Sequence, residues 1–419
     1  MKMNNKGSAL FFGLIVISVL AILSVGFIAM VVTEARNTER FIAGINAIDV
    51  AEAGLEYGIW EILHNSANYD PLEGWVLDSA VSPVTQSKQD FLSDSAGNQI
   101  GEYEVTISKP SSEIFTIVAV AGIPNLTVPE SIQRTVQVSL VGEPLFEKAI
   151  TGFNDINLSV GVFIDSYDDD LGAYGGANRS DQGHICTDSI ADDAIHIRNF
   201  VLVKGDVVVG VGGIPADVIK YNVFGQITGT ERVATEPTPS PSIQAPTGLP
   251  DRGTLTVAWG QTKTISSSGE YDNIEVKWGA TLNITADATI YVKNDFNVKH
   301  LSAVKVLNDA DVDIIVGKTF EVAAGCLIKN SSGDAANLAV FGLDSATSIN
   351  IIGLCSVEGT FYAPNASFNS GGLVSIFGAV TAQHVNVGEL ALFHFDESLM
   401  RRPAVPSTGR SKAIDWHTK

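Results

Sequence analysis

The chain has 419 residues, which is too many for one ordinary domain and enough for two or three. Its formal net charge of −21 argues against a nucleic acid as a partner, because nucleic acids bind to basic surfaces. Charged residues make up only 17% of the chain, and 39 glycines accompany many Val, Ile, Thr and Asn residues. This composition indicates β-structure with frequent turns, and the acidic surface suits an exported protein.

A long apolar run begins close to the N-terminus. Residues 9–32 contain no charged side chain, and Lys2, Lys6 and Gly7 precede them. As a helix the run spans roughly 36 Å, enough to cross a hydrocarbon core of roughly 30 Å. A cleaved secretory signal would have a shorter apolar part, followed by a small-residue site. Two interpretations remain: a single-pass anchor with its N-terminus inside, or cleavage between Gly7 and Ser8, which leaves the apolar helix on the mature protein.

The same helix is predicted over residues 8–65, because no proline occurs before Pro71. Two stripes follow its surface at helical spacing. The first is apolar and consists of Phe41, Ile45, Ile48, Leu55, Ile59 and Ile62, and the second is small and consists of Gly44, Ala47, Ala51, Gly54 and Gly58. Small residues at this spacing let another backbone approach closely, so we expect Gly44, Ala47, Ala51 and Gly54 to pack against neighbouring helices.

Glu52 interrupts the apolar stripe with a carboxylate. A buried carboxylate without a partner is costly, so this position needs an explanation. Either Glu52 lies at the edge of the stripe and stays solvated, or it meets a positive charge on a neighbouring subunit.

This region resembles the N-terminal segment of PilX-type minor pilins and of the K-type pseudopilins of type II secretion. The residues that carry the resemblance are Lys6-Gly7-Ser8, the apolar run, and Ala51-Glu52-Ala53-Gly54-Leu55-Glu56. The sequence departs from major pilins, whose fifth mature residue is a glutamate, because the fifth residue counted from Ser8 is Phe12. That departure favours a position at the tip or in initiation of a filament, with Phe12 in the packed helix.

The resemblance implies that residues 1–7 are a leader removed by a prepilin peptidase. It also implies that residues 8–65 hold the protein in the bacterial inner membrane, with the N-terminus inside and the C-terminal part in the periplasm. An inner-membrane assembly platform would then add the chain to other pilins or pseudopilins, and the C-terminal part would reach the pilus or the cell surface.

A small α+β module, similar to a pilin head, is predicted to include residues 66–142. Residues 66–98 are polar and resemble a loop, and three β-type runs follow at 101–107, 114–121 and 132–140. The first and third runs alternate between polar and apolar residues, as half-buried antiparallel strands do.

A β-rich region at 143–251 comes next, and it contains two clusters of aspartates. Carboxylates in a Gly-rich loop can ligate Ca²⁺, which makes Asp165, Asp168, Asp169 and Asp170 candidate calcium ligands. The alternative is that these aspartates cap and bend turns, and no other cofactor is expected. Residues 236–250 contain five prolines and are predicted to form an extended loop.

Residues 252–399 contain a repeat that predicts a mainly-β, right-handed parallel β-helix, with residues 400–419 as a polar tail. The runs that begin at Ala288, Val312 and Ala336 lie 24 residues apart, as do those at Asp295 and Thr319. Units at 359–363 and 378–382 follow at a shorter interval. With the segments 164–167 and 393–397, this order resembles a group of long minor-pilin-like proteins that carry a C-terminal β-helix.

The three cysteines, Cys186, Cys326 and Cys355, are too few for a disulfide framework. We expect them to be small buried residues, with a Cys326–Cys355 bond as the alternative.

The sequence therefore predicts a membrane-held structural or assembly protein of a type IV pilus or a related secretion filament, without enzyme activity. Its β-helix would contact a surface or carbohydrate ligand as an adhesin. The alternative is a surface-bound lyase or hydrolase acting on polysaccharide, because parallel β-helices also form such enzymes. Its candidate acids would be Asp309, Asp311 and Asp313, which alternate along one expected strand.

Overall fold

The computed structural model describes residues 5–65, 75–78, 84–109, 114–142, 144–402 and 411–418. The chain divides into two compact units. Unit 1 consists of residues 1–140 and 413–419, and unit 2 consists of residues 141–412. Unit 2 is thus inserted between two segments of unit 1.

Unit 1 combines one long helix with a six-stranded sheet. The helix, α1, extends over Asn5–Asn65. The sheet has the order β1-β2-β3-β4-β5-β31, and β1 to β4 pair antiparallel. Its strands are β1 (Val76–Asp78), β2 (Val84–Ser93), β3 (Gln99–Lys109), β4 (Ile114–Ile123), β5 (Ile132–Gly142) and β31 (Ser411–Thr418).

The three expected strands of this module are present as β3, β4 and β5, but the sheet is larger than expected. Residues 84–93 form β2 instead of a loop, and residues 411–418 form β31 instead of a polar tail. Both segments are rich in polar residues, so their sequences carry little of the apolar alternation that marks a half-buried strand.

Unit 2 is a stack of short strands that pair in parallel. Each strand from β15 to β24 pairs with the third strand after it, so three strands make one coil. The long strands β28 (Cys355–Gly371) and β29 (Val374–Val387) each pass through all three positions. The parallel pairing of these strands agrees with the spacing of the sequence repeat.

The other strands of unit 2 that come before the long loop at 236–250 are β6 (Ile150–Leu158), β7 (Phe163–Tyr167), β8 (Ile185–Thr187), β9 (Ile195–Ile197), β10 (Leu202–Val203), β11 (Val207–Val209), β12 (Ile219–Tyr221), β13 (Gln226–Ile227) and β14 (Glu231–Val233). A short helix, α2 (Pro215–Val218), precedes β12.

Those after the loop are β15 (Leu255–Val257), β16 (Thr262–Ile265), β17 (Gly269–Tyr271), β18 (Ile274–Val276), β19 (Thr281–Ile284), β20 (Ala288–Val292), β21 (Asp295–Val298), β22 (Ala303–Val306), β23 (Val312–Val316), β24 (Thr319–Val322), β25 (Leu327–Asn330), β26 (Leu338–Gly342), β27 (Ser348–Ile352) and β30 (Leu392–Asp396). Three 3₁₀ turns, η1 (Asp169–Leu171), η2 (Ala335–Asn337) and η3 (Glu397–Arg401), complete the unit.

The 24-residue step is confirmed at two of its three places. Ala288 pairs with Val312, and Asp295 pairs with Thr319. The third unit is displaced, because Val312 pairs with Leu338 instead of Ala336. The turn η2 occupies Ala335–Asn337 and moves the start of β26 by two residues.

The core of unit 2 consists of side chains that point inward and stack from coil to coil. Phe296 and Phe320 are 0% and 1% exposed, and their ring centroids lie 5.1 Å apart. Ile349 continues this row as the register partner of Phe320, and the ring of Phe361, from the row that contains Val340, lies 6.1 Å from Phe320. Parallel strands in register put identical positions above one another, which is why the apolar repeat yields continuous rows.

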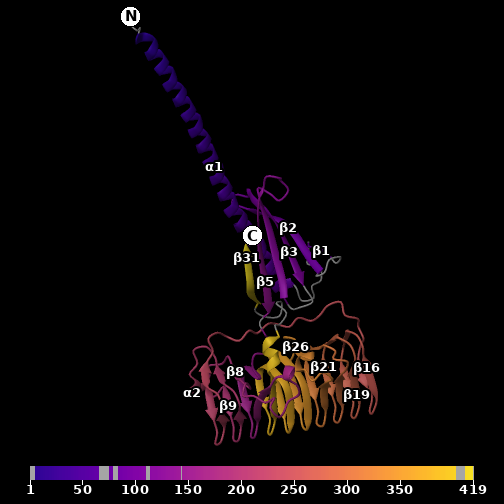
Figure 1. Cartoon of the computed structure of the whole chain (residues 1–419). Coiled ribbons are helices and arrows are strands. Elements are labelled where there is room, and N and C mark those ends of the chain that lie inside the picture. Colours follow the sequence, from indigo (N-terminus) through magenta and orange to yellow (C-terminus); the bar gives the residue numbers. More distant parts are fainter. Residues whose placement is uncertain are drawn as a thin grey trace. The chain divides into compact units, whose positions relative to one another are not determined.

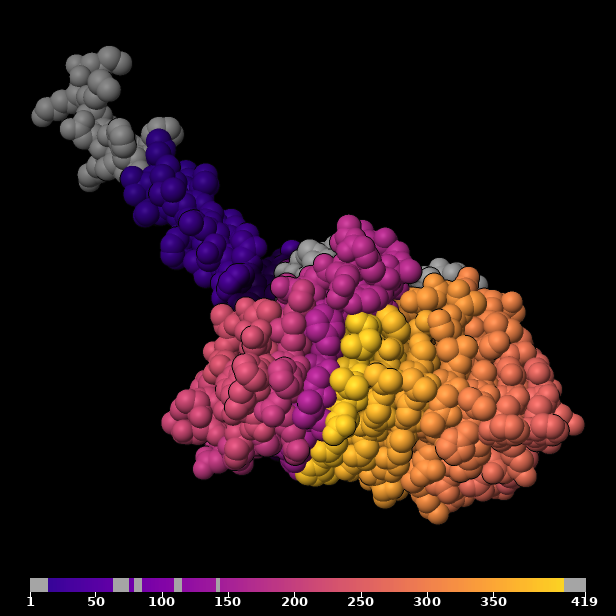
Figure 2. Space-filling model, turned by 90° about the horizontal axis from the view of Figure 1, so that it is seen from below, coloured from indigo at the N-terminus to yellow at the C-terminus, as the bar shows by residue number. Residues whose placement is uncertain are grey.

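The chain enters and leaves unit 2 in the middle of the stack. The first strands, β6 and β7, pair in parallel with the last, β29 and β30, and we call this junction the seam. Figure 2 shows the seam as adjoining purple and yellow surfaces, with the rest of the stack on both sides. From β7 the chain winds to one end at β14 and then resumes at the other end with β15, so the expected division at residue 251 does not separate two units.

The proline-rich segment 236–250, which we call the strap, connects the two ends of the stack (Figure 1). It has neither helix nor strand, as the prolines predict. Thr238 Oγ1 donates to Asp188 Oδ1 at 2.8 Å, and Tyr362 Oη donates to the Pro241 carbonyl at 2.9 Å. These contacts hold the strap along the outside of the coils.

Candidate functional site

The segment of α1 from Leu14 to Val32 is an apolar surface that no other described residue covers. Every large hydrophobic residue from Leu14 to Val32 exposes at least 41% of its surface. By length and composition the helix contains a segment able to cross a membrane. At roughly 25 cal/mol per Å² of apolar surface, water is an unfavourable environment for such a helix, so lipid or other helices must cover it.

The C-terminal half of α1 packs on the sheet of its own unit through the small residues. A Cβ atom on Gly54 would lie 2.7 Å from the ring of Tyr103 on β3, and one on Gly58 would lie 2.9 Å from Ile117 on β4. Gly44, Ala47 and Ala51 are also buried, the two alanines completely. The prediction that the small stripe faces neighbouring helices is therefore corrected for this unit.

The physical reason is that small residues permit the close approach of any partner, and here the partner is the sheet. Spacing alone cannot distinguish a sheet from a second helix. Two members of the apolar stripe are exposed: Phe41 is 69% exposed and Ile45 is 45% exposed.

Phe41, Ile45 and Glu52 follow one another along α1 at steps of four and seven residues, so they lie on the same side of the helix. Glu52 is half-buried and forms no ion pair with any residue that the structure describes. Gly7, Ser8 and Phe12 lie in the first turns of α1, where only the backbone is described, and residues 1–4 lie outside the described residues. The expectations of leader cleavage and of packing through Phe12 thus remain predictions.

A buried acid–histidine pair crosses the seam. Asp165 on β7 is the register partner of His394 on β30, and His394 Nδ1 lies 2.5 Å from Asp165 Oδ1. Both side chains are almost completely buried. The two segments that the sequence singled out, 164–167 and 393–397, are therefore neighbours in space.

The second oxygen of Asp165 is also fully used. Tyr174 Oη donates to Asp165 Oδ2 at 2.9 Å, and Arg179 Nη2 lies 3.1 Å from the same oxygen. The Tyr174 ring covers His394, with ring centroids 3.8 Å apart. Burial and the Asp165 carboxylate raise the pKa of Tyr174 to about 12. Because both oxygens of Asp165 have partners and His394 is buried, this cluster stabilises the seam.

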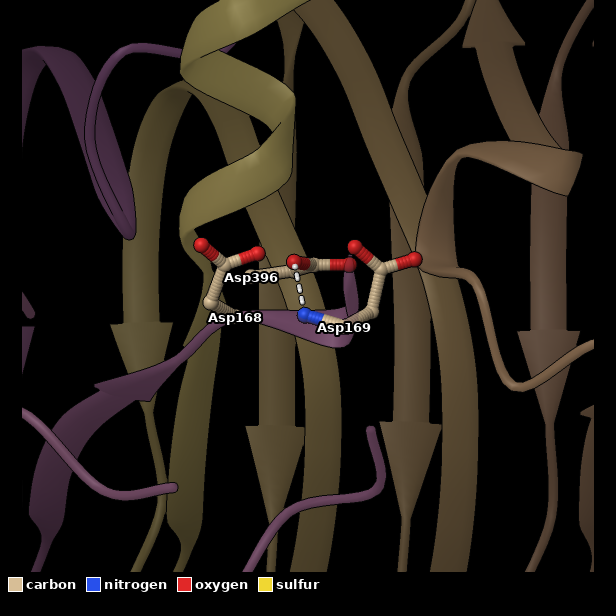
Figure 3. A group of neighbouring side chains, drawn as sticks. All are labelled: Asp168, Asp169 and Asp396. Atoms are coloured by element: carbon tan, nitrogen blue, oxygen red, sulfur yellow. Dashed lines mark hydrogen bonds between the residues drawn. The ribbon is translucent and has the colours of Figure 1, made fainter. Parts of the chain in front are cut away.

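A second acidic group lies at the C-terminal ends of the same two strands, just beyond β7 and at the last residue of β30. Asp168, Asp169 and Asp396 each place one carboxylate oxygen within 4.8 Å of the others. Figure 3 shows the Asp396 carboxylate between the other two, with a hydrogen bond from the Asp169 backbone N–H. Burial, followed by the Asp169 charge, raises the pKa of Asp396 to about 7.

The candidate calcium ligands are thus separated by the fold. Asp168 and Asp169 belong to the group, whereas Asp165 is used by His394 and Arg179, and the Asp170 carboxylate pairs with Arg401 at 2.7 Å. The sequence missed Asp396, because its position beside Asp168 depends on the pairing of the first strands with the last.

The aspartates of the alternative enzyme hypothesis do not line one strand. Asp309 and Asp311 precede β23 in a turn, and only Asp313 lies within it. Burial and the Asp311 charge raise the pKa of Asp313 to about 7. Its register neighbours Thr289 and Ala339 carry no charge.

All three cysteines are buried free thiols, as expected for small core residues. Cys326 directly precedes β25 and Cys355 begins β28, and the pairing of Leu327 with Ser356 places the two cysteines next to each other on adjacent coils. The alternative of a disulfide is not realised in this structure.

Comparisons with known proteins give two findings. Residues 228–402 match a family described as a domain of unknown function (DUF7305), which covers the part of unit 2 from β14 to η3. Among solved structures, the crystal structure of the competence-associated pilin ComZ from Thermus thermophilus aligns over 90% of this chain and 97% of that chain, with 12% identity and a TM-score of 0.30. No curated protein matches the sequence.

Proposed function

We propose that the chain is a pilin-like subunit of a type IV pilus or a related secretion filament. The observation that carries the proposal is the division of α1. Its C-terminal half packs on the sheet, while its N-terminal half presents an uncovered apolar surface from Leu14 to Val32. A helix of this kind serves equally well in a bilayer before assembly and among other apolar helices afterwards.

In this proposal the prepilin peptidase cleaves between Gly7 and Ser8, and α1 crosses the bacterial inner membrane with its N-terminus inside. An assembly platform then transfers the subunit to other pilins or pseudopilins. The helix surface with Phe12, Phe41, Ile45 and Glu52 faces those neighbours, since the small stripe is occupied by the sheet. A glutamate on that face would pair with a positive charge of the next subunit.

Unit 2 is in this proposal a right-handed parallel β-helix. The parallel pairing supports the architecture, and the strong preference of parallel crossovers for one hand supports the handedness. Unit 2 would be periplasmic before assembly and exposed on the filament afterwards, as a non-enzymatic adhesive head at the tip or in initiation. A carbohydrate or another surface is the proposed ligand.

The test is mass spectrometry of the mature N-terminus from membrane fractions and from sheared filaments. A protein that begins at Ser8 in both fractions supports the proposal. A matched variant, Gly7→Leu, should keep its full N-terminus and stay in the membrane, because the small residue before the cleaved bond is lost. An intact Met1 terminus of the wild type, found only in membranes, would show a static anchor instead.

A further inference from the structure

The ends of β7 and β30 present two aspartates in the same structural role. Asp168 caps η1, where its Oδ1 accepts from the Asp170 N–H at 3.2 Å. Asp396 caps η3, where its Oδ1 accepts from the Ser398 N–H at 3.1 Å. Each cap uses one oxygen of its carboxylate. Oδ2 of neither residue is used by these caps.

Three polar side-chain atoms of Asp169, Asp396 and Ser398 are buried and have no hydrogen-bond partner among the described residues. They are Asp396 Oδ2, Asp169 Oδ1 and the hydroxyl of Ser398. Asp396 is 0% exposed and Ser398 is 2% exposed. Ser398 lies two residues after Asp396, and its backbone N–H donates to Asp396 Oδ1 at 3.1 Å, so its side chain stands beside the group. Buried oxygens without donors are costly and rare, so this arrangement needs a group that binds oxygen.

The remaining oxygens fit one hard divalent cation. Ca²⁺ binds carboxylate, hydroxyl and water oxygens at about 2.3–2.6 Å, so two ligands on opposite sides of the ion lie about 5 Å apart. The oxygens of Asp168, Asp169 and Asp396 lie within 4.8 Å of one another. We propose that Asp168, Asp169 and Asp396, with the Ser398 hydroxyl, form a binding site for one Ca²⁺ ion at the seam.

Two arginines neutralise part of the charge around the group without filling it. Arg401 Nη2 lies 2.6 Å from Asp168 Oδ1, the oxygen that already serves as the cap. Arg402 pairs with Asp334, the cap of η2. Neither arginine forms an ion pair with Asp169 or Asp396. The site thus keeps its two innermost carboxylates for the cation.

The cation would join parts of the chain that are far apart in the sequence. Asp168 and Asp169 follow β7, near the start of unit 2, whereas Asp396 ends β30 and Ser398 follows it, near the end of the unit. Binding at this position connects the first coil to the last, beside the contact between Asp165 and His394. The site is therefore a clamp on the seam, and its occupancy should stabilise unit 2.

The experiment uses the full chain in detergent, stripped with a chelator, and measures Ca²⁺ binding by isothermal titration calorimetry and thermal unfolding with and without Ca²⁺. We expect one ion per chain and a rise in the unfolding temperature of unit 2 with the Ca²⁺ concentration. Loss of an outer partner of a bound metal already costs about 10- to 100-fold in affinity. For Asp396→Asn we therefore expect a loss of at least about tenfold.

The matched control is Asp170→Asn, which removes the same charge one residue away from the group and leaves its three carboxylates in place. It should bind Ca²⁺ within about threefold of wild type, since an exposed charge contributes little. If Asp396→Asn fails to fold, Ser398→Ala is the second variant, because it removes only the hydroxyl. Absence of stoichiometric binding by wild type, or equal binding by wild type and the group variants, would overturn the proposal.

Discussion

The two units treat apolar side chains in opposite ways. In unit 2 the inward residues of successive coils cover one another, and Phe296, Phe320 and Phe361 are at most 1% exposed. In unit 1 the apolar side chains of α1 from Leu14 to Val32 are exposed, and no other described part of the chain covers them. Apolar side chains that cover one another stabilise the folded chain without a partner. Exposed apolar side chains add to stability only when a membrane or another molecule covers them.

The same contrast applies to polar groups at the seam. Asp165 and His394 form a cluster in which each acceptor of the acid has a donor. Two residues further on, Asp396 retains a buried oxygen without one. The satisfied cluster is sufficient for a structural role, and the unsatisfied one is the place to look for a ligand.

The largest effect should come from a cavity in the covered rows. Phe320→Ala removes a ring that contacts Phe296 and Phe361, and we expect the free energy of unfolding of unit 2 to fall by about 3–5 kcal/mol. The control Phe41→Ala removes the same ring from an exposed position and should cost less than about 0.5 kcal/mol. Urea denaturation measures both, and similar losses would contradict the contrast.

A charge in the uncovered row should leave folding unchanged and abolish membrane retention. For Leu23→Lys we expect an insertion cost of about 2.5–3.5 kcal/mol at the centre of a bilayer. Extraction of membranes at high pH should then release the variant, while Leu23→Ala stays bound. If the lysine variant is retained as well as wild type, α1 does not cross the membrane at this position.

The third prediction concerns the boundary between the two halves of α1. Gly54→Val forces side-chain atoms into Tyr103, and we expect unit 1 to lose about 1–3 kcal/mol. The matched control is Gly26→Val, because nothing lies within 4 Å of a Cβ at that position. Thermal unfolding of both variants in detergent tests the assignment. If Gly26→Val lowers the stability and Gly54→Val does not, the assignment of the packed and the exposed half of α1 is wrong.

The smallest effect should appear as a pH dependence. Burial raises the folded-state pKa of Asp313 to about 7, above the unfolded value of about 3.9. The folded state therefore holds this proton more tightly, and its contribution to stability is complete below pH 4 and lost as pH rises to about 7. Asp313→Asn should remove this part of the pH dependence of the free energy of unfolding, whereas Asp309→Asn at the neighbouring turn should leave it unchanged. Denaturation at pH 4, 5.5 and 7 provides the measurement.

Local patterns in the sequence predict much of this molecule. The apolar run gives the helix, the proline content gives the strap, and the 24-residue spacing gives the pairing of Ala288 with Val312. Each of these features depends on neighbours in the chain or on a regular repeat. The position of β26, by contrast, shifts because the turn η2 lies outside the repeat.

The remaining features depend on contacts between distant parts of the chain. No local pattern pairs β6 with β29, places β31 beside β5, or brings Asp396 to Asp168. The small stripe of α1 was recognised, but its partner is a sheet that the spacing does not specify. The sequence therefore predicts only part of a candidate site at such a junction. Asp168 and Asp169 lie in one sequence cluster, whereas Asp396 lies near the other end of unit 2 in the sequence.

The position of the seam also determines the order in which the protein can fold. A chain that leaves the ribosome or the membrane with its N-terminus first delivers β6 and β7 early, yet Ile150 waits for Val380 and Asp165 waits for His394. Until then the unpaired edges of β6 and β7 at the seam can pair with strands of other chains. Such exposed edges favour aggregation, which chaperones counteract. Such long-range pairing is slow, so completion of the last coil should set the rate at which the subunit matures.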